Sequence, residues 1–215
     1  MGDGPLSATT GRAPRSDAQR NRERLLASAS RLFAERGPDV PFTEIAKDAG
    51  VGVGTVYRHF PSREALIEAA YRSELDAVCD AAAGLARTLP AEQALRAWMD
   101  RFLDYMATKA GMSEAIRAVI SAGGDPYARS RERLDDVLGG LLHAATAAGR
   151  VRPGINADDV LMTLSGIALA AGQPSQRAQA GRMLDLLFDG LRKHDAAPGC
   201  EAAAPALHPG VRLDR

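Results

Sequence analysis

The chain is 215 residues long, 46% of them hydrophobic, and its 27 basic side chains balance its 27 acidic ones. These values are normal for a globular protein with one large or two small domains, and the zero net charge gives no sign of nucleic-acid binding. Two widely separated cysteines exclude a disulfide framework, and the lack of a secretory signal or a membrane-spanning run predicts a cytoplasmic protein without membrane contact.

Residues 1–15 are rich in Gly, Pro, Ser, Thr and Arg, a composition typical of a disordered arm. Such an arm could contact DNA phosphates or the minor groove, or have no role. A first helix is predicted over residues 16–36, because Ser16 and Gln19 form a capping-box pattern and apolar residues follow at helical spacing. Seven arginines against three acids between residues 12 and 36 suit a segment that faces phosphates, although a solvated helix face has the same composition.

The stretch over residues 43–60 reads TEIAKDAGVGVGTVYRHF and has the pattern of two short helices joined by a tight turn. Thr43 is a suitable N-cap for the first helix, and Gly50 stands where the chain has to turn. In the second helix Val56 and Phe60 are four residues apart, so both face inward. The polar side chains spread over the other faces, which is the helix-turn-helix pattern for the DNA major groove.

The longer run IAKDAGVGVGTVYRHFPSREAL, residues 45–66, resembles the DNA-binding domain of the tetracycline-repressor (TetR) family. The likeness lies in the order and spacing of its glycine, threonine and aromatic residues and in the Phe-Pro-Ser that follows the second helix. Two positions depart from the family pattern. Members of the family usually have serine where this chain has Gly52, and they often have a polar or basic residue where it has Val53. These departures remove a side-chain cap and a phosphate contact, so they bear on the affinity for DNA more than on the fold.

On this interpretation the second helix and its neighbours supply the contacts with DNA. Tyr57 and His59 offer hydrogen bonds to phosphate oxygens, and Thr55 can reach a phosphate or a thymine methyl group. Arg58 is the residue best suited to read a guanine edge, and the resemblance implies that a basic residue at the position of Arg63 approaches a phosphate. The predicted DNA-binding residues are Thr43, Val53, Gly54, Thr55, Tyr57, Arg58, His59 and Arg63.

Two other interpretations of this stretch are open. Residues 50–55 could be a glycine loop that binds phosphate, but no β-branched strand precedes them and no lysine follows, as a P-loop requires. Tyr57 and His59 could instead be core residues of an unrelated helical bundle.

Six further helices are predicted over the remainder, which has no stretch of period two and no internal repeat. Ser62, Ser113 and Asn156 stand at expected helix starts, and Asp125-Pro126 has the pattern of an N-cap followed by a first-turn proline. The predicted helices cover about residues 63–87, 90–109, 113–121, 126–148, 157–171 and 175–193. We therefore expect an all-α protein of about nine helices, with a disordered arm over residues 1–15, a helix-turn-helix domain over 16–61, a regulatory and dimerisation bundle over 62–194 and a disordered tail over 195–215.

The resemblance also implies a small-molecule effector that binds between helices of the second part and changes the spacing of the DNA-binding domains. The Gly-Gly-Asp-Pro loop at residues 123–126 and the Val-Arg-Pro segment at 151–153 are similar to the SbtR-like subgroup, which names no ligand. Aromatic and methionine side chains would line such a pocket, although apolar residues at helical spacing are more often ordinary core. The predicted lining residues are Trp98, Phe102, Tyr105, Met106, Met112, Tyr127 and Leu141.

The last two helices carry more apolar surface than one layer of a bundle needs, which predicts a four-helix interface between two copies of the chain. The predicted interface residues are Leu161, Leu164, Ala168, Leu184, Leu187, Phe188 and Leu191. A two-fold dimer would place its recognition helices about 34–36 Å apart, or a multiple of that, on a pseudo-palindromic operator.

Catalysis finds little support in the sequence. The four histidines are scattered without an H-E-x-x-H motif, and the adjacent acids at residues 135–136 and 158–159 diverge by about 100° on a helix. We therefore predict no enzyme, no cofactor and no metal. The prediction is a homodimeric repressor that a small-molecule effector releases from a palindromic operator in double-stranded DNA. The alternatives are an activator or ligand-independent DNA-binding regulator, and an all-helical ligand-binding protein or enzyme.

Overall fold

A computed structural model describes residues 14–127 and 129–193 of the chain. Over these residues the protein is all-α as predicted, with nine α-helices, one short 3-10 helix and an isolated antiparallel bridge between Val151 and Arg192. The helices are α1 (Pro14–Arg36), α2 (Phe42–Ala49), α3 (Val53–His59), α4 (Arg63–Thr88), α5 (Ala91–Gly111), α6 (Ser113–Ser121), α7 (Ser130–Ala147), α8 (Ala157–Ala170), η1 (Pro174–Gln176) and α9 (Arg177–Leu191). The predicted tail and all of the predicted arm except Pro14 and Arg15 lie outside the described residues.

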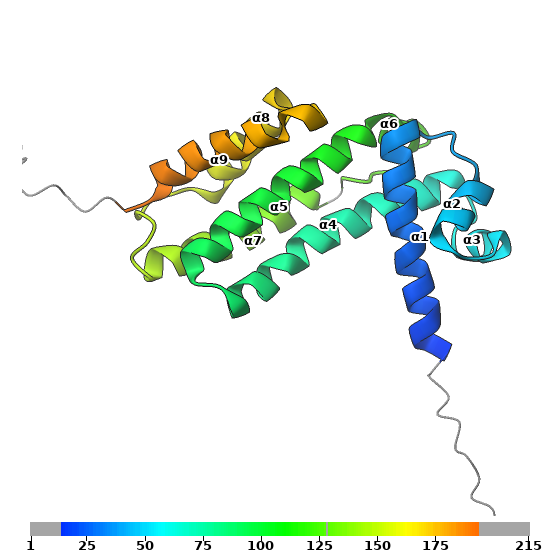
Figure 1. Ribbon diagram of the computed structural model, residues 1–215, viewed down its shortest axis with the longest axis horizontal. Helices are drawn as coiled ribbons and strands as arrows, with labels where there is room; N and C mark the ends of the chain where they lie inside the picture. Colours follow the sequence, from blue (N-terminus) through cyan, green and yellow to red (C-terminus); the bar gives the residue numbers. More distant parts are fainter. Residues whose placement is uncertain (1–13, 128, 194–215) are drawn as a thin grey trace, which may run out of the picture.

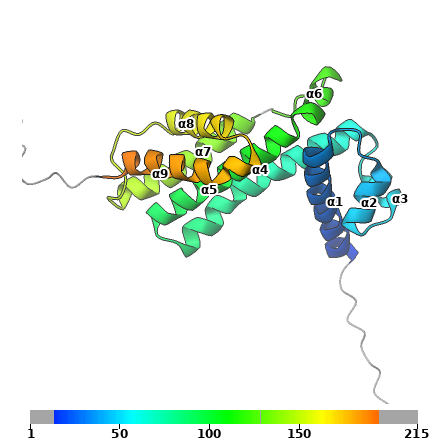
Figure 2. The ribbon, with the colours of Figure 1, turned by 45° about the horizontal axis from the view of Figure 1, so that its top comes forward.

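Two parts of the molecule share α4 as their connection. The helices α1, α2 and α3 form a compact unit at the right of Figure 1, and α4 starts at this unit and runs into the second part. There α5 and α7 lie alongside α4, and α6 sits at the corner that touches α1. The helices α8 and α9 form an outer layer on this bundle in both views (Figures 1 and 2).

The apolar stripe of α1 anchors the first unit, and it is the stripe that the 3.6-residue period predicts. All five of its members are buried: Leu25, Leu26, Ala29, Leu32 and Phe33. The Ser30 hydroxyl, also buried, donates a hydrogen bond to the Ala70 carbonyl of α4 over 3.4 Å. The angle between α1 and α4 is therefore set by packing and by a polar contact.

Helix starts agree with the predictions at two positions and differ at four, the last of which is the start of α7. The Ser62 hydroxyl accepts a hydrogen bond from the Ala65 amide over 3.1 Å, and the Asn156 side chain accepts one from the Asp158 amide over 2.9 Å. Thr43 is not an N-cap, because α2 begins at Phe42 and the N-cap position is occupied by Pro41. Ser16 and Ser113 likewise lie inside the first turns of α1 and α6.

The start of α7 is four residues later than predicted. The Asp125 carboxylate does not cap a helix but accepts a hydrogen bond from the Tyr127 amide over 3.2 Å, which closes a local turn. The helix begins at Ser130, after Arg129 adopts a left-handed conformation with φ of 59°. An Asp-Pro pair is compatible with a turn as well as with a helix start, so the pattern did not distinguish the two.

A glycine lets the two parts of the molecule approach closely. Gly111, the last residue of α5, faces Ala34 on α1, and a Cβ atom at position 111 would lie 2.8 Å from the Cβ of Ala34. Atoms at that separation overlap, so a larger residue would push α1 away from the bundle. This contact holds the corner between α5 and α6 against the first unit.

Candidate nucleic-acid interface

The helix α3 has one buried side and one solvent-facing side. Val56 and Phe60 are buried as predicted, and they fix the helix on the first unit. Tyr57 is 60% exposed and is the largest side chain on the free face of α3. The other exposed residues of α3 are Val53, Gly54, Arg58 and His59, while Thr55 is half-buried.

The turn before α3 has the geometry that the sequence predicts. Gly50 adopts φ of 66° and ψ of 39°, a left-handed conformation that costs little without a Cβ atom. The amide of Val51 donates to the Ala46 carbonyl over 2.9 Å, which closes the end of α2, and the Val51 side chain packs on the core. The α2–α3 unit is therefore a helix-turn-helix whose second helix presents an exposed polar face.

Tyr57 is supported by an aromatic neighbour from α2. Its ring centroid lies 5.1 Å from that of Phe42, with the two planes tilted by 51°, and Phe42 is buried. Contacts of this kind stabilise a defined ring orientation. The phenol oxygen of Tyr57 is thus carried on a supported side chain rather than on a freely rotating one.

Arg63, which was predicted to contact a phosphate, instead makes contacts within the protein. Its guanidinium donates hydrogen bonds to the Pro38 carbonyl over 2.5 Å and to the Val40 carbonyl over 2.7 Å. It also lies 5.4 Å from the ring centroid of Phe42. Arg63 is half-buried at the start of α4 and binds the connection between α1 and α2.

The excess of positive charge near the interface is smaller than the arginine count indicates. Arg31 pairs with Asp48 over 2.5 Å and with Glu35, and Arg36 pairs with Glu44. Hydrogen bonds from Ser28 and Arg31 hold the pKa of the Asp48 carboxyl below its usual range. These arginines are partly neutralised by their partners.

Several cations near α3 have no acidic partner among the described residues, including Arg24, which donates to Asn21 and lies near Gly50. Lys47 and Arg58 are exposed, and Arg22 of α1 lies 5.6 Å from the ring centroid of Phe60. Thr43 is exposed in the same shallow hollow as Lys47. The positive charge available to DNA is therefore concentrated around the ends of α2 and α3.

The predicted pocket residues form a close-packed core in this conformation. Trp98, Phe102, Tyr105, Met112 and Leu141 are buried, Met106 is half-buried, and only Tyr127 is exposed. The rings of Trp98 and Phe102 stack at 5.8 Å, and the Trp98 indole donates to the Val78 carbonyl over 2.9 Å. Tyr127 borders a surface hollow that it shares with Arg131 and Asp158.

A buried group of hydroxyls lies inside this apolar core, and of its members only Tyr105 was among the predicted site residues. The Tyr71 and Tyr105 hydroxyls are 2.8 Å apart, and the Tyr71 hydroxyl donates to Ser130 over 3.4 Å. Burial, with Tyr71 adding to it, raises the pKa of Tyr105 far above its usual range. At the edge of the group, Lys109 lies 4.5 Å from the Tyr127 ring centroid, and burial lowers the pKa of this lysine.

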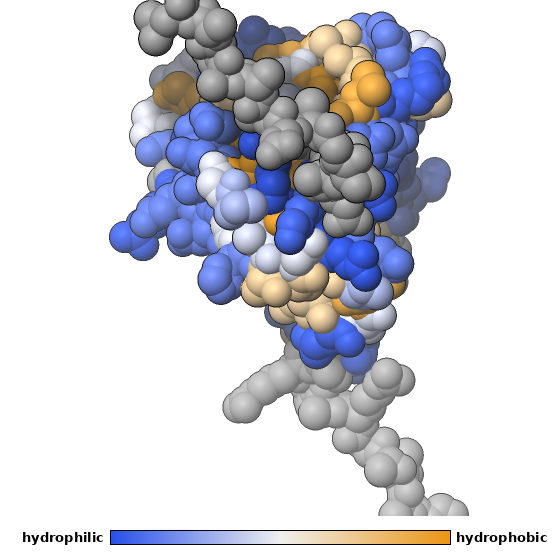
Figure 3. All heavy atoms as spheres, turned by 90° about the vertical axis from the view of Figure 1, so that its left-hand side faces the viewer, coloured by the Kyte–Doolittle hydropathy of each residue, from blue (hydrophilic) through white to orange (hydrophobic). Residues whose placement is uncertain are grey.

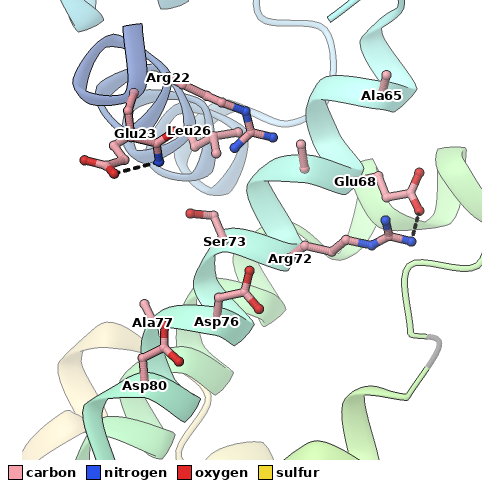
Figure 4. A pocket seen from close by; sticks show the side chains of 12 residues that line it. Arg22, Glu23, Leu26, Ala65, Glu68, Arg72, Ser73, Asp76, Ala77 and Asp80 are labelled. Atoms are coloured by element: carbon pink, nitrogen blue, oxygen red, sulfur yellow. Dashed lines mark hydrogen bonds and ion pairs between the residues drawn. The ribbon is translucent and has the colours of Figure 1, made fainter. Parts of the chain in front are cut away.

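Another hollow, of about 630 Å³, lies between parts of α1 and α4. Its walls mix charged side chains with Leu26 and three alanines, and Figure 4 shows Arg72 turned toward Glu68 on the same helix, at 2.6 Å, with Arg22 on the opposite wall. Asp76 and Asp80 extend the acidic side along α4. This hollow has none of the aromatic lining that the sequence predicted for an effector pocket.

Most residues predicted at a dimer interface are instead in the core of their own chain. Leu161, Leu164, Leu184, Phe188 and Leu191 are buried, and Ala168 and Leu187 are half-buried. The free faces of α8 and α9 carry other apolar side chains, with Leu169 78% and Leu186 75% exposed and Met162 also exposed. On the face visible in Figure 3, one group of hydrophobic residues lies toward the top, the side on which α8 and α9 lie in Figure 1, and a second group lies lower.

Metal and membrane sites are not indicated in the described part of the chain. Between residues 14 and 193, without residue 128, no cluster of His, Cys, Asp or Glu side chains could hold a metal ion. None of the helices over these residues combines the length and the apolarity that a membrane span requires.

Comparisons with known proteins agree with this geometry. Residues 25–70 match the family model of bacterial regulatory proteins of the tetR family, and residues 90–193 match that of the C-terminal domain of SbtR-like transcriptional regulators. The TetR transcriptional regulator SCO0520 from Streptomyces coelicolor is 53% identical, with a TM-score of 0.78 over 80% of this chain and 98% of that one. A TetR regulatory protein from Mycobacterium vanbaalenii is 32% identical, with a TM-score of 0.71 over 84% of this chain and all of that one.

Curated relatives match over a shorter stretch. HTH-type transcriptional regulators of Staphylococcus aureus are 40% identical over 63 residues, which is 29% of this chain and 34% of their own length. The chain thus spans only about a third of those relatives, while it covers the Streptomyces and Mycobacterium structures almost completely. The chain has an exposed second helix in a helix-turn-helix, and it is similar to TetR regulators along most of its length. The chain therefore belongs to the TetR family and is a DNA-binding transcriptional regulator.

Proposed function

We propose that the protein is a homodimeric repressor that binds a palindromic operator and leaves it when a small-molecule effector binds to the helical bundle. The observation that supports this most directly is α3, whose buried Val56 and Phe60 leave Tyr57, Arg58 and His59 facing solvent. A short helix held in this way fits the major groove. In this proposal the partner is double-stranded DNA, the protein acts in the cytoplasm, and it has no catalytic activity.

The roles that we propose for individual residues follow from their position on α3. The Tyr57 hydroxyl and the His59 imidazole donate to phosphate oxygens, and the Arg58 guanidinium reaches a guanine edge, where its paired donors match two acceptors. Thr55 and the exposed Thr43 are secondary contacts. Gly54 has open space around it, so its backbone can approach the DNA closely.

The homodimer rests on exposed apolar surface. Leu169 on α8 and Leu186 on α9 are more than two-thirds exposed, which costs free energy unless a partner covers them. The glycines at positions 166 and 190 have no neighbour within 4 Å of a notional Cβ atom, so a second copy can approach these helices closely. Pairing about a two-fold axis would bring both recognition helices to one face of the DNA.

A regulator without an effector is the second candidate. The close packing of Trp98, Phe102 and Tyr105 favours it, because a ligand could enter this core only if the bundle opened. The hydroxyl pair of Tyr71 and Tyr105 favours the effector, because buried hydroxyls are suited to bind a polar group of a ligand.

Binding to DNA from the promoter next to the protein's own gene tests the residue assignments. We expect Tyr57→Ala and Arg58→Ala each to weaken the complex about tenfold or more in a mobility-shift assay, because each removes a direct contact. Arg101→Ala is the matched control, since Arg101 is an exposed arginine on α5 and should leave the affinity unchanged. If both α3 variants bind as tightly as the control, our assignment of these contacts is wrong.

A further inference from the structure

Arg63 links three structural elements of the DNA-binding unit. It is the first residue of α4, and its Nη1 atom donates to the carbonyls of Pro38 and Val40, over 2.5 and 2.7 Å. Both carbonyls belong to the connection between α1 and α2. The guanidinium therefore fixes, from α4, the segment that leads into the helix-turn-helix.

The same guanidinium is the first of three neighbouring groups, and the last of them lies on the exposed face of α3. Its central carbon lies 5.4 Å from the ring centroid of Phe42, on α2, and this ring lies 5.1 Å from that of Tyr57, on α3. Phe42 is buried between the other two, while Tyr57 is largely exposed. A displacement of Arg63 would change the packing of Phe42 and hence the support of Tyr57.

We propose that Arg63 is a positioning residue for DNA binding: it holds the α1–α2 connection and Phe42 in place and thereby sets the direction of the Tyr57 hydroxyl. This inference rests on the proposed contact between Tyr57 and DNA. It replaces the expected role of Arg63 as a phosphate contact, and it makes the start of α4 a point from which movement reaches the recognition helix.

The chemistry of arginine suits this role better than that of lysine. One planar group donates two hydrogen bonds to carbonyls through Nη1, while its central carbon lies 5.4 Å from the centroid of an aromatic ring. Lysine has the same charge but is a compact point charge on a flexible stem, so it would satisfy a phosphate contact but cannot both donate to these carbonyls and place a planar cation beside Phe42. The variant Arg63→Lys therefore separates positioning from attraction to phosphate.

The first measurement needs no DNA. The chain has four tyrosines, so a protein with carbon-13-labelled tyrosine should give four well-separated sets of ring signals by NMR. The set that disappears in Tyr57→Phe belongs to Tyr57. We expect Arg63→Lys to shift the Tyr57 signals and to leave those of Tyr105 and Tyr127 in place, because of these three rings only that of Tyr57 adjoins Phe42, the ring next to Arg63.

The second measurement is affinity for a duplex that the unaltered protein selects from a random pool. We expect Arg63→Lys to weaken binding about tenfold or more, which is the size of effect that losing hydrogen bonds from a charged group produces. Because the charge stays, the dependence of the affinity on salt should not change. Phe42→Leu removes the central ring without changing the charge. We expect this variant to show both the shifted Tyr57 signals and the weaker binding. It also tests the inference if the Arg63→Lys protein does not fold.

Either of two results overturns the inference: unchanged Tyr57 signals in Arg63→Lys, or binding as tight as that of the unaltered protein. Arg63→Gln separates the roles further, since loss of a phosphate contact would lower the slope of log affinity against log salt by about 0.9. If the unaltered protein selects no duplex, the proposed function fails instead, and the NMR result still decides whether Arg63 positions Tyr57.

Discussion

Replacing Leu186 by glutamate should yield a folded monomer that binds operator DNA about 100-fold more weakly than the unaltered protein, or weaker still. The Leu186 side chain is 75% exposed on α9, so the substitution takes little from the chain's own core. In the proposed dimer the same position would place a charge in an apolar interface, where an unpaired charge is strongly unfavourable. A monomer contacts one half-site only and loses the gain in affinity that comes from joining two binding units.

Sedimentation velocity and mobility-shift assays would measure the two effects. Ile120→Glu is the control, because Ile120 on α6 is also a large exposed apolar residue, at 45%, but lies away from α8 and α9. We expect this control to remain a dimer and to bind DNA normally. A Leu186→Glu protein that sediments as a dimer would show that the interface is elsewhere.

Replacing Trp98 by alanine should lower the free energy of unfolding by about 3–5 kcal/mol, the usual range for removing a large aromatic side chain from a core. Trp98 is fully buried, stacks on Phe102 and donates to the Val78 carbonyl of α4. The substitution removes these contacts together, and neighbours in a rigid bundle cannot close the space completely.

Urea unfolding followed by far-UV circular dichroism would measure this loss of stability. Tyr127→Ala is a matched control, because it removes an aromatic ring that is 40% exposed, and it should cost about 1 kcal/mol or less. A loss below that value for Trp98→Ala would mean that the space around Trp98 is an open pocket rather than a packed core.

Local patterns were sufficient to predict the fold and the recognition helix. The apolar positions of α1 follow a helical period, and Gly50 stands where α2 has to end, so both elements follow from residues near one another in the chain. Val56 and Phe60 are four residues apart and so share one side of the helix, which predicts the side of α3 that is buried. Propensity and spacing determine such features without tertiary information.

Features that depend on contacts distant in sequence could not be predicted in this way. The helix α8 has apolar residues on most of its faces, so spacing alone does not say whether Leu161 or Leu169 lies in the core. The carbonyl partners of Arg63 are more than 20 residues away, and nothing in the pattern around Arg63 indicates them. Ser130 is the first residue of α7, but the Asp-Pro pair indicated a start at residue 126. The contact between Ser130 and Tyr71 could therefore not be predicted.

Selection of bound duplexes from a random DNA pool tests the central claim most directly, because it reports DNA binding and dimer symmetry together. We predict that the unaltered protein recovers a pseudo-palindrome, with two inverted half-sites whose centres are about one helical turn or a multiple of it apart. Recovery of a single half-site without its inverted repeat, or of no enriched sequence at all, would contradict the account.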